Sequence, residues 1–196
     1  MAYHSLSLIL PAVIGIIGRR EQHLKRRVAA ISAFTSSTKA DYAVAEITVK
    51  STLQAAFDHF ASKFEKIDVS VSNAGHLSNV AAIDDSDDED WREGSETNTK
   101  KSCNAIRAFL PQAALYAVVL DANTGLATWH SIPGLSSYSS SKIASAQLFE
   151  HPQVGHPDSC VVKVHLGVVE MAMTEKTRVT ANDYRKFCGN ETWTLY

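Results

Sequence analysis

Stretches of apolar residues alternate with amphipathic segments along most of this chain, which indicates strands alternating with helices. The apolar strands are expected at 12–18, 67–71, 115–122 and 159–169. Helical patterns follow the first three of them, and one more helical pattern, "STLQAAFDHFASKFEK", precedes residue 67. Strands joined by helices form right-handed units with a parallel sheet covered on both faces. The pattern therefore predicts a doubly wound α/β domain.

The helical segments carry recognisable start and stop signals. Ser51 is a candidate N-cap for the helix before residue 67, whose apolar stripe is Leu53, Ala56, Phe57, Phe60 and Phe64. The acidic run "DDSDDED" precedes a helix expected from about Trp91 to Leu110, where negative charge complements the helix dipole. A later helix containing Tyr138 is expected to end at His151-Pro152. From residue 175 the pattern is weak, so 175–196 is interpreted as a C-terminal tail.

The length and composition fit a single globular domain over residues 1–196, with 45% hydrophobic and 20% charged residues. The formal net charge of -2 gives no reason to expect a nucleic acid or an anionic membrane as partner. Three widely spaced cysteines and eight histidines without ligand spacing indicate neither a disulfide framework nor a metal site. The apolar first eighteen residues lack a preceding Lys or Arg, so a buried strand is favoured over a signal peptide, and a cytoplasmic location is expected.

The stretch "SIPGLSSYSSSKIA" sets Tyr138 four residues ahead of Lys142, which puts both on one helix face. An ammonium beside a phenol favours the phenolate and lowers the pKa of the tyrosine, which suits a general acid or base. A Tyr-x-x-x-Lys pair also arises by chance in a chain with six tyrosines. The pair therefore indicates a catalytic site only if the sequence also supplies the other residues that such a site needs.

Several motifs in order resemble the short-chain dehydrogenase/reductase family over roughly residues 13–174. They are "GRR" after an early strand, "VSNAG", "TNTKKSCNAIRAFLP", "PGLSSYSSSK" and "VHLGVVEMAM". The resemblance implies a Rossmann-like sheet and an NADP(H)-dependent oxidoreductase that interconverts a ketone and a secondary alcohol. The motifs look most like filamentous-fungal members, many of which act in secondary-metabolite pathways. The implied partners are a small-molecule carbonyl or alcohol substrate and a second copy of the chain in a homo-oligomer.

The resemblance also assigns roles to residues of this sequence. Tyr138 would exchange the proton, Lys142 would lower the Tyr138 pKa and hold the cofactor ribose, and Asn98 would anchor a water of the proton relay. Thr124 stands where the family has its catalytic serine. The implied cofactor contacts also include Asn73 and Gly75 of the Asn-Ala-Gly turn, Glu46 beside the adenine, Arg107 as a looser candidate, and Val169.

Arg19 and Arg20 follow the early strand, where a guanidinium can form a fork with a ribose 2'-phosphate. This position favours NADP over NAD as the cofactor. The alternative is a basic start of a helix that faces water.

The sequence also departs from the family pattern. It opens at what resembles the second strand, so the first strand and the Gly-rich turn that cradles the pyrophosphate are expected to be absent. Met171 stands at the threonine position that contacts the nicotinamide, and a thioether cannot donate a hydrogen bond. Both ends resemble a truncated member. These departures leave open a catalytically inactive binding or assembly protein, or a chain that does not fold.

Overall fold

The computed structural model describes residues 13–124 and 133–165. Contacts divide the chain into two compact units, Met1–Glu65 and Lys66–Tyr196, which are taken in turn below. Met171, Val169 and the whole of the expected C-terminal tail, 175–196, lie outside the described residues. No helix in the described ranges is long and apolar enough to cross a bilayer.

The first unit contains two parallel strands and two helices. In chain order these are β1 (Val13–Gly18), α1 (Glu21–Phe34), β2 (Lys39–Val44) and α2 (Lys50–Phe64). The strands pair in register from Val13 opposite Lys39 to Gly18 opposite Val44, so their carboxyl ends lie side by side. The sequence pattern did not predict β2, because "KADYAV" mixes charged and apolar residues without a clean alternation.

The core of the first unit is built on α2. Its residues Leu53, Ala56, Phe57 and Phe60 are buried, which confirms four members of the predicted apolar stripe, while the fifth, Phe64, is half-buried. The predicted N-cap is wrong: Val49 caps the helix, and Ser51 lies inside its first turn. The hydroxyl of Thr52 donates to the carbonyls of Val49 and Glu46 and so ties the first turn of the helix to the residues before it.

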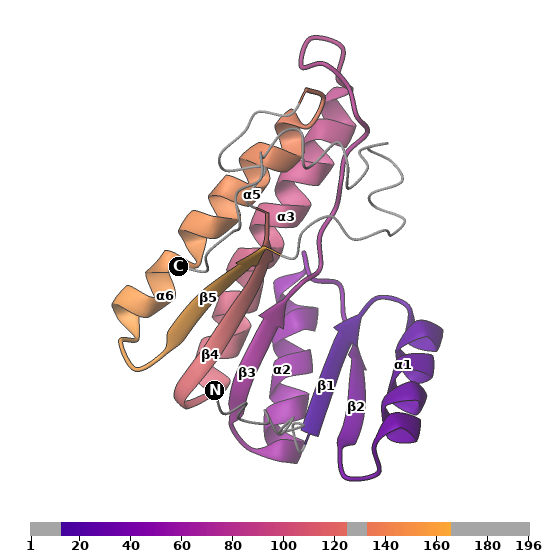
Figure 1. Cartoon of the computed structure of the whole chain (residues 1–196), viewed down its shortest axis with the longest axis vertical. Helices are drawn as coiled ribbons and strands as arrows, with labels where there is room; N and C mark the ends of the chain where they lie inside the picture. Colours follow the sequence, from indigo (N-terminus) through magenta and orange to yellow (C-terminus); the bar gives the residue numbers. More distant parts are fainter. Residues whose placement is uncertain (1–12, 125–132, 166–196) are drawn as a thin grey trace, which may run out of the picture. The chain divides into compact units, whose positions relative to one another are not determined.

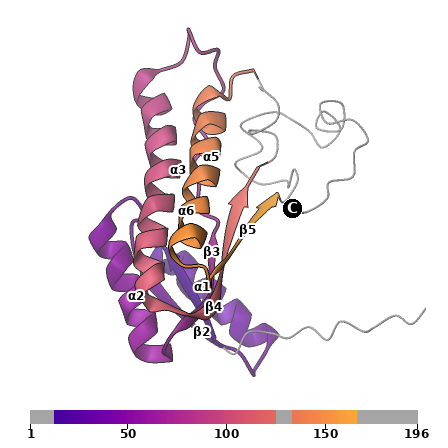
Figure 2. The same ribbon diagram turned by 90° about the vertical axis from the view of Figure 1, so that its left-hand side faces the viewer.

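The second unit contains a parallel three-stranded sheet in the order β3-β4-β5. Its elements are β3 (Ile67–Ser72), α3 (Asp88–Phe109), the short 3-10 helix η1 (Leu110–Gln112), β4 (Ala113–Asn123), α5 (Ser136–Leu148), α6 (Glu150–Gly155) and β5 (Cys160–His165). The helices α3 and α5 run side by side against one face of this sheet (Figure 1, Figure 2). The buried residues Ala117, Val119 and Asp121 of β4 lie on that face.

The opposite face of the second unit differs from the expectation. Val69 and Val71 of β3 are 51% and 61% exposed, so the described residues cover this sheet on one face only. The strands are parallel, as predicted, but in the described part of the chain they form two sheets instead of one.

The helix boundaries follow from local signals. Asp87 caps α3 by accepting a hydrogen bond from the backbone N–H of Asp90, and Asp88, Glu89 and Asp90 fill its first turn. The acidic run therefore stabilises the helix start, as predicted, but the helix begins three residues before Trp91. His151-Pro152 does not end the Tyr138 helix: α5 ends at Leu148, and Pro152 lies in α6, where the first turn of a helix tolerates proline.

Candidate active site

Tyr138 and Lys142 lie one turn apart on α5, as their spacing predicted. The ammonium of Lys142 is 5.6 Å from the centre of the Tyr138 ring. Lys142 is 5% exposed, and the lysine is fixed by a hydrogen bond from Nζ to the carbonyl of Ala122 at 2.8 Å. The pair is therefore held by the end of β4 as well as by its own helix.

Burial and a carboxylate determine the electrostatics around Tyr138. Burial, and then the nearby charge of Asp121, raise the pKa of Tyr138 above its ordinary value. Burial also lowers the pKa of Lys142, against the attraction of Asp121. Both effects act in the direction opposite to the one expected from Lys142, whose lowering of the tyrosine pKa stays a prediction. In this environment the phenol stays neutral and can donate a proton.

Thr124 directly follows β4, where two hydrogen bonds join that strand to α5. The first is the Lys142 bond to Ala122, and the second runs from Asn123 Nδ2 to the Lys142 carbonyl at 3.2 Å. The backbone N–H of Thr124 donates to the side-chain oxygen of Asn123 at 2.8 Å. The structure thus fixes the Thr124 backbone next to the strand end that holds Lys142.

Asn98 joins α3 to the turn that follows β3. Its Oδ1 accepts from the His76 N–H and its Nδ2 donates to the His76 carbonyl, both at 2.8 Å. Nδ2 also donates to Ser141 Oγ on α5 at 2.9 Å. A Cβ at Gly75 would lie 3.3 Å from Asn98 Oδ1, so the turn approaches the amide closely. The structure brings Asn98 and Gly75 together, while the exposed Asn73 lies two residues before Gly75 on the same turn.

The side chain of Asn98 is occupied by protein atoms. It is fully buried, and its amide makes the three hydrogen bonds above. Its backbone carbonyl accepts from Ser102 Oγ at 3.0 Å. The expected water-anchoring role stays a prediction, and the observed role is a clamp on the His76 backbone.

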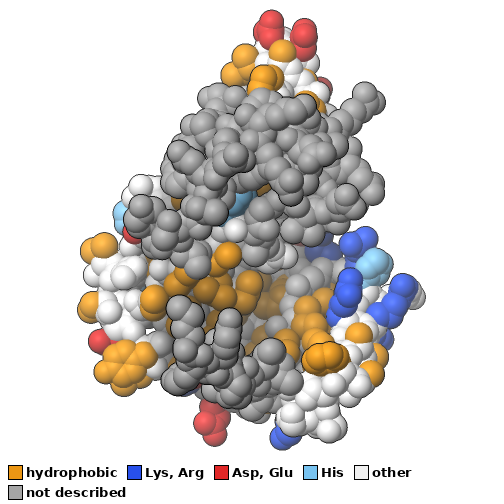
Figure 3. All heavy atoms as spheres, in the orientation of Figure 1, with side chains coloured by type: hydrophobic (Ala, Val, Ile, Leu, Met, Phe, Trp, Pro, Cys, Tyr) orange, Lys and Arg blue, Asp and Glu red, His pale blue; other side chains and the backbone are white. Residues whose placement is uncertain are grey.

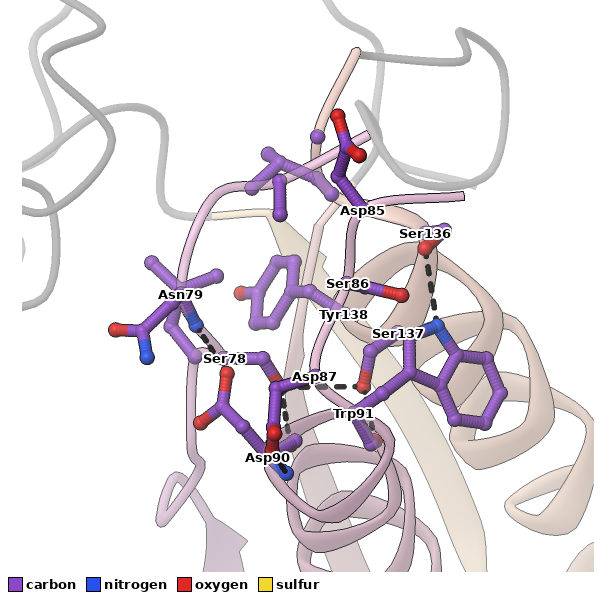
Figure 4. Close-up of a pocket in the computed structure, with 14 residues that line it drawn as sticks. Ser78, Asn79, Asp85, Ser86, Asp87, Asp90, Trp91, Ser136, Ser137 and Tyr138 are labelled. Carbon is purple, nitrogen blue, oxygen red and sulfur yellow. Dashed lines mark hydrogen bonds between the residues drawn. The ribbon is translucent and has the colours of Figure 1, made fainter. Parts of the chain in front are cut away.

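A pocket of about 170 Å³ opens beside Tyr138. The loop after β3 contributes Ser78, α3 contributes Asp90 and Trp91, and the start of α5 contributes Ser137. Figure 4 shows the Tyr138 ring among these side chains, with Trp91 Nε1 donating to Ser136 Oγ at 3.0 Å. The pocket gives a small molecule a place to lie against the tyrosine.

The first unit places a second group of expected site residues at the carboxyl ends of β1 and β2. Arg19 follows β1, and its Nη1 lies 3.5 Å from Oε2 of Glu46, which follows β2. Arg20 is the N-cap residue of α1 and is exposed. The structure therefore brings Arg19 and Glu46 together, but as an ion pair in which the Glu46 carboxylate binds the Arg19 guanidinium.

Basic side chains surround this edge of the first unit. Figure 3 shows Lys and Arg side chains gathered with a histidine over α1. The pKa of His23 is lowered by the positive charge of Arg20, then by desolvation and by Arg26 and Arg27. The edge is electropositive and suits an anionic group.

Comparison with known proteins identifies the family. The family model for short chain dehydrogenases matches residues 11–182. The chain belongs to the short-chain dehydrogenase family. The comparison with curated proteins gives no match.

Solved structures share the fold of this short-chain dehydrogenase. Gluconate 5-dehydrogenase from Burkholderia cenocepacia, in complex with NADP and tartrate, matches with a TM-score of 0.77 and 19% identity, over 89% of this chain and 68% of that one. The alcohol dehydrogenase of the archaeon Thermococcus sibiricus, complexed with 5-hydroxy-NADP, matches with a TM-score of 0.70 and 19% identity, over 77% of this chain and 63% of that one. An NADPH-bound short chain oxidoreductase from Pseudomonas aeruginosa, described as containing an atypical catalytic center, matches with a TM-score of 0.77 and 18% identity, over 84% of this chain and 65% of that one.

These likenesses establish the Rossmann-like α/β fold. The short-chain dehydrogenase described here spans less than two thirds of the length of the Thermococcus enzyme. Its activity is therefore argued below as a proposal.

One expected cofactor residue is not placed with the others. Arg107 is exposed in the last turn of α3, nine residues after Asn98 and so about 13 Å farther along the helix. That end of α3 leads through η1 into the start of β4, whereas Thr124 follows the end of β4. The motif spacing could not reveal this, because it does not state the direction of the helix relative to the sheet.

Several residues of this short-chain dehydrogenase escaped the sequence analysis. Asp121 on β4 and Lys101 on α3 are buried near Lys142. His76, Asp90 and Glu93 offer ligand-type atoms within 4.8 Å of one another, a spacing that a cation could bridge. No local motif signals either group, because each is assembled from separate elements.

Proposed function

We propose that this protein is an NADP(H)-dependent short-chain dehydrogenase that interconverts a ketone and a secondary alcohol. The observation that carries the proposal is the Tyr138–Lys142 pair on α5, with Lys142 bonded to Ala122 and the tyrosine facing a pocket. Membership of the family supports this reaction class. Activity in a fungal secondary-metabolite pathway, in the cytoplasm and as a homo-oligomer, belongs to the same proposal.

In this proposal Tyr138 is the proton donor for carbonyl reduction. Its phenol is protonated at neutral pH and can therefore donate to a carbonyl oxygen, while its raised pKa makes it a weaker acid than an ordinary tyrosine. Thr124 supplies a hydroxyl that polarises the same oxygen in place of the family's serine, although its methyl group restricts the rotamer. Lys142, held by Ala122, keeps a positive charge near the tyrosine. Asn98 holds the turn after β3 in place.

The residues suit a nicotinamide dinucleotide in their chemistry. Arg19 and Arg20 offer guanidinium groups for a 2'-phosphate, and Arg19 must leave Glu46 to form a fork with it. Gly75, Asn73, Lys142 and Val169 would hold the remaining parts, as in the family. When bound, the cofactor supplies the hydride. The three solved structures named above carry NADP, an NADP derivative or NADPH, which supports NADP over NAD.

The alternative is a catalytically inactive binding or assembly protein. Met171 at the nicotinamide position favours it, because a thioether cannot donate a hydrogen bond. The Arg19–Glu46 ion pair also favours it, because that pair occupies the guanidinium. In this case the Tyr138 phenol would contribute nothing to the biological output.

The test is substrate-dependent oxidation of NADPH by the purified, folded chain across a panel of ketones, with NADH in a parallel series. The proposal predicts turnover of at least one ketone and a preference for NADPH. Absence of turnover with both cofactors, in a sample that melts cooperatively, would favour the inactive alternative.

A further inference from the structure

A histidine and two carboxylates meet where the loop after β3 approaches the first turns of α3. His76 comes from the loop, and Asp90 and Glu93 come from α3. Their ligand-type atoms, one nitrogen and two carboxylate oxygens, all lie within 4.8 Å of one another. The proposed reaction gives none of these three side chains a role.

The Nε2 atom of His76 lacks a partner that its burial calls for. The His76 side chain as a whole is 28% exposed, but its Nε2 is buried and has no hydrogen-bond partner among the described residues. Oδ1 of Asp90 lies 4.0 Å from this nitrogen, which is too long for a hydrogen bond. Because buried polar atoms are nearly always satisfied, an ion between the two atoms would explain the arrangement.

The spacing of the three atoms suits the ligands of one metal ion. Zinc binds a histidine nitrogen or a carboxylate oxygen at about 2.0–2.2 Å, so two ligands of a tetrahedral site are about 3.4 Å apart. Asp90 and Glu93 are three residues apart on α3, so they are neighbours on one face of the helix. Small side-chain rotations, chiefly of the exposed Glu93, bring the three atoms to this spacing.

Hydrogen bonds from the protein fix two of the three ligands. Asn98 holds the backbone of His76 at its N–H and its carbonyl. Oδ2 of Asp90 accepts from the Asn79 N–H at 2.7 Å, while Oδ1 is the oxygen that lies 4.0 Å from His76 Nε2. Ser78 Oγ donates to the Asp90 carbonyl at 2.9 Å. Hydrogen bonds of this kind orient the ligands of metal sites.

The charges on this part of α3 favour a cation. Arg92 precedes Glu93 directly, but it pairs with Glu89 and Glu96. Among the described residues, no hydrogen bond or ion pair engages the Glu93 carboxylate, so it can bind a metal ion. A divalent cation also neutralises the two negative charges of Asp90 and Glu93.

We propose that His76, Asp90 and Glu93 bind one divalent transition-metal ion, with Zn²⁺ as the best match. Zn²⁺ accepts mixed nitrogen and oxygen ligands, whereas Mg²⁺ and Ca²⁺ prefer oxygen ligands alone. The bound ion ties the loop after β3 to α3 behind Asp90, which forms the wall of the Tyr138 pocket together with Asn79 (Figure 4). This site is independent of the proposed oxidoreductase activity.

The test is calorimetric titration of ZnCl₂ into the untagged full chain after treatment with EDTA and buffer exchange. We expect saturable binding of Zn²⁺ and none of MgCl₂ under the same conditions. Glu93→Gln should weaken Zn²⁺ binding by about 10-fold or more. Glu89→Gln is the matched control, because Glu89 is an exposed carboxylate one turn earlier that pairs with Arg92.

His76→Gln tests the second ligand, beside the control His156→Gln, whose histidine is exposed in the same unit. We expect His76→Gln to weaken Zn²⁺ binding at least as much as Glu93→Gln, and His156→Gln to leave it unchanged. Full-strength Zn²⁺ binding by both Glu93→Gln and His76→Gln would overturn the proposal. Absence of Zn²⁺ binding by a wild-type chain that melts cooperatively would also overturn it.

A second readout is the urea midpoint of the folded chain. Zn²⁺ should raise the midpoint of wild type and of Glu89→Gln, since an ion that binds only the folded chain stabilises it, but not that of Glu93→Gln. An equal rise in Glu93→Gln and Glu89→Gln would overturn the proposal. Neither measurement uses ketone reduction, so a chain that binds Zn²⁺ at this site but reduces no ketone would contradict the proposed function alone.

Discussion

The side chain of Asn98 holds the backbone of His76 at both its N–H and its carbonyl, each at 2.8 Å. A third hydrogen bond joins the same amide to Ser141, so one side chain links α3, α5 and the turn after β3. Asn98 is fully buried, so all three of these hydrogen bonds depend on its amide.

Asn98→Ala should lower the free energy of unfolding by about 2–4 kcal/mol, since it removes three hydrogen bonds, two of them to the backbone of His76. The urea midpoint measures this loss. Asn79→Ala is the control, because the Asn79 side chain is exposed and its bond to Asp90 uses the backbone N–H. Equal midpoints for the two variants would show that the clamp contributes no stability.

Gly94 permits the close approach of α3 to the loop after β3 and to α5. A Cβ at this position would overlap Ser78 Oγ and would lie 2.8 Å from Ser137 Oγ. Gly94→Ala should therefore destabilise the fold by about 1–3 kcal/mol through overpacking, although alanine favours helices.

Gly155→Ala provides the matched control for Gly94→Ala. Nothing lies within 4 Å of a Cβ built at Gly155, which is also helical. Thermal melting should show a lower midpoint for Gly94→Ala and an unchanged or higher one for Gly155→Ala. A Gly94→Ala protein as stable as wild type would mean that the two serines move apart without cost.

The ion pairs of Asp41 in the first unit predict a contribution to the stability of the fold that is lost in acid. Burial opposes the ionisation of Asp41, but hydrogen bonds from Lys63, His59 and the Tyr42 N–H outweigh it and lower the pKa of Asp41 from 3.8 to about 2. A lowered carboxyl pKa stabilises the fold above pH 3.8, and this stabilisation is lost as the pH falls toward 2.

Asp41→Asn should therefore be less stable than wild type by about 1 kcal/mol at pH 6, after allowing for solvent screening. The difference should shrink as the pH approaches 2. Urea midpoints between pH 6 and 2 measure it, with Asp84→Asn as the control for removal of an exposed carboxylate. A difference that does not vary with pH would contradict the assignment.

Arg19 carries the predicted preference for a 2'-phosphate. Arg19→Ala should weaken NADPH binding by about 10-fold or more and leave NADH binding nearly unchanged, because only NADPH has the phosphate. Calorimetry on the folded chain measures both. Lys39→Ala removes one positive charge at the opposite end of β2 and serves as the control. An equal loss for both cofactors would argue against this role for Arg19.

The sequence predicted the elements better than their assembly. Parallel strands, the apolar stripe of α2 and the acidic start of α3 follow from local periodicity and helix electrostatics, and the structure confirms them. The missed strand β2 and the displaced start of α2 show the limit: "KADYAV" lacks an alternation, and a backbone cap at Val49 leaves no side-chain signal.

Part of the candidate site could likewise be predicted from the sequence, and part could not. Tyr138 and Lys142 could be paired from their spacing, because a helix sets it. The raised pKa of Tyr138 could not be predicted from the sequence, because it depends on burial and on Asp121 from another element. Lys101 was hidden for the same reason: its Ser72 partner is 29 residues away in sequence. Tertiary packing decides these charges.

The central claim is that the Tyr138 phenol donates the proton in carbonyl reduction. Its most direct test is kcat/KM for NADPH-dependent ketone reduction by Tyr138→Phe, beside the control Tyr116→Phe, whose tyrosine is 72% exposed. The account predicts a loss of about 10²-fold or more for Tyr138→Phe and little change for Tyr116→Phe. Equal activity in wild type and Tyr138→Phe would contradict it.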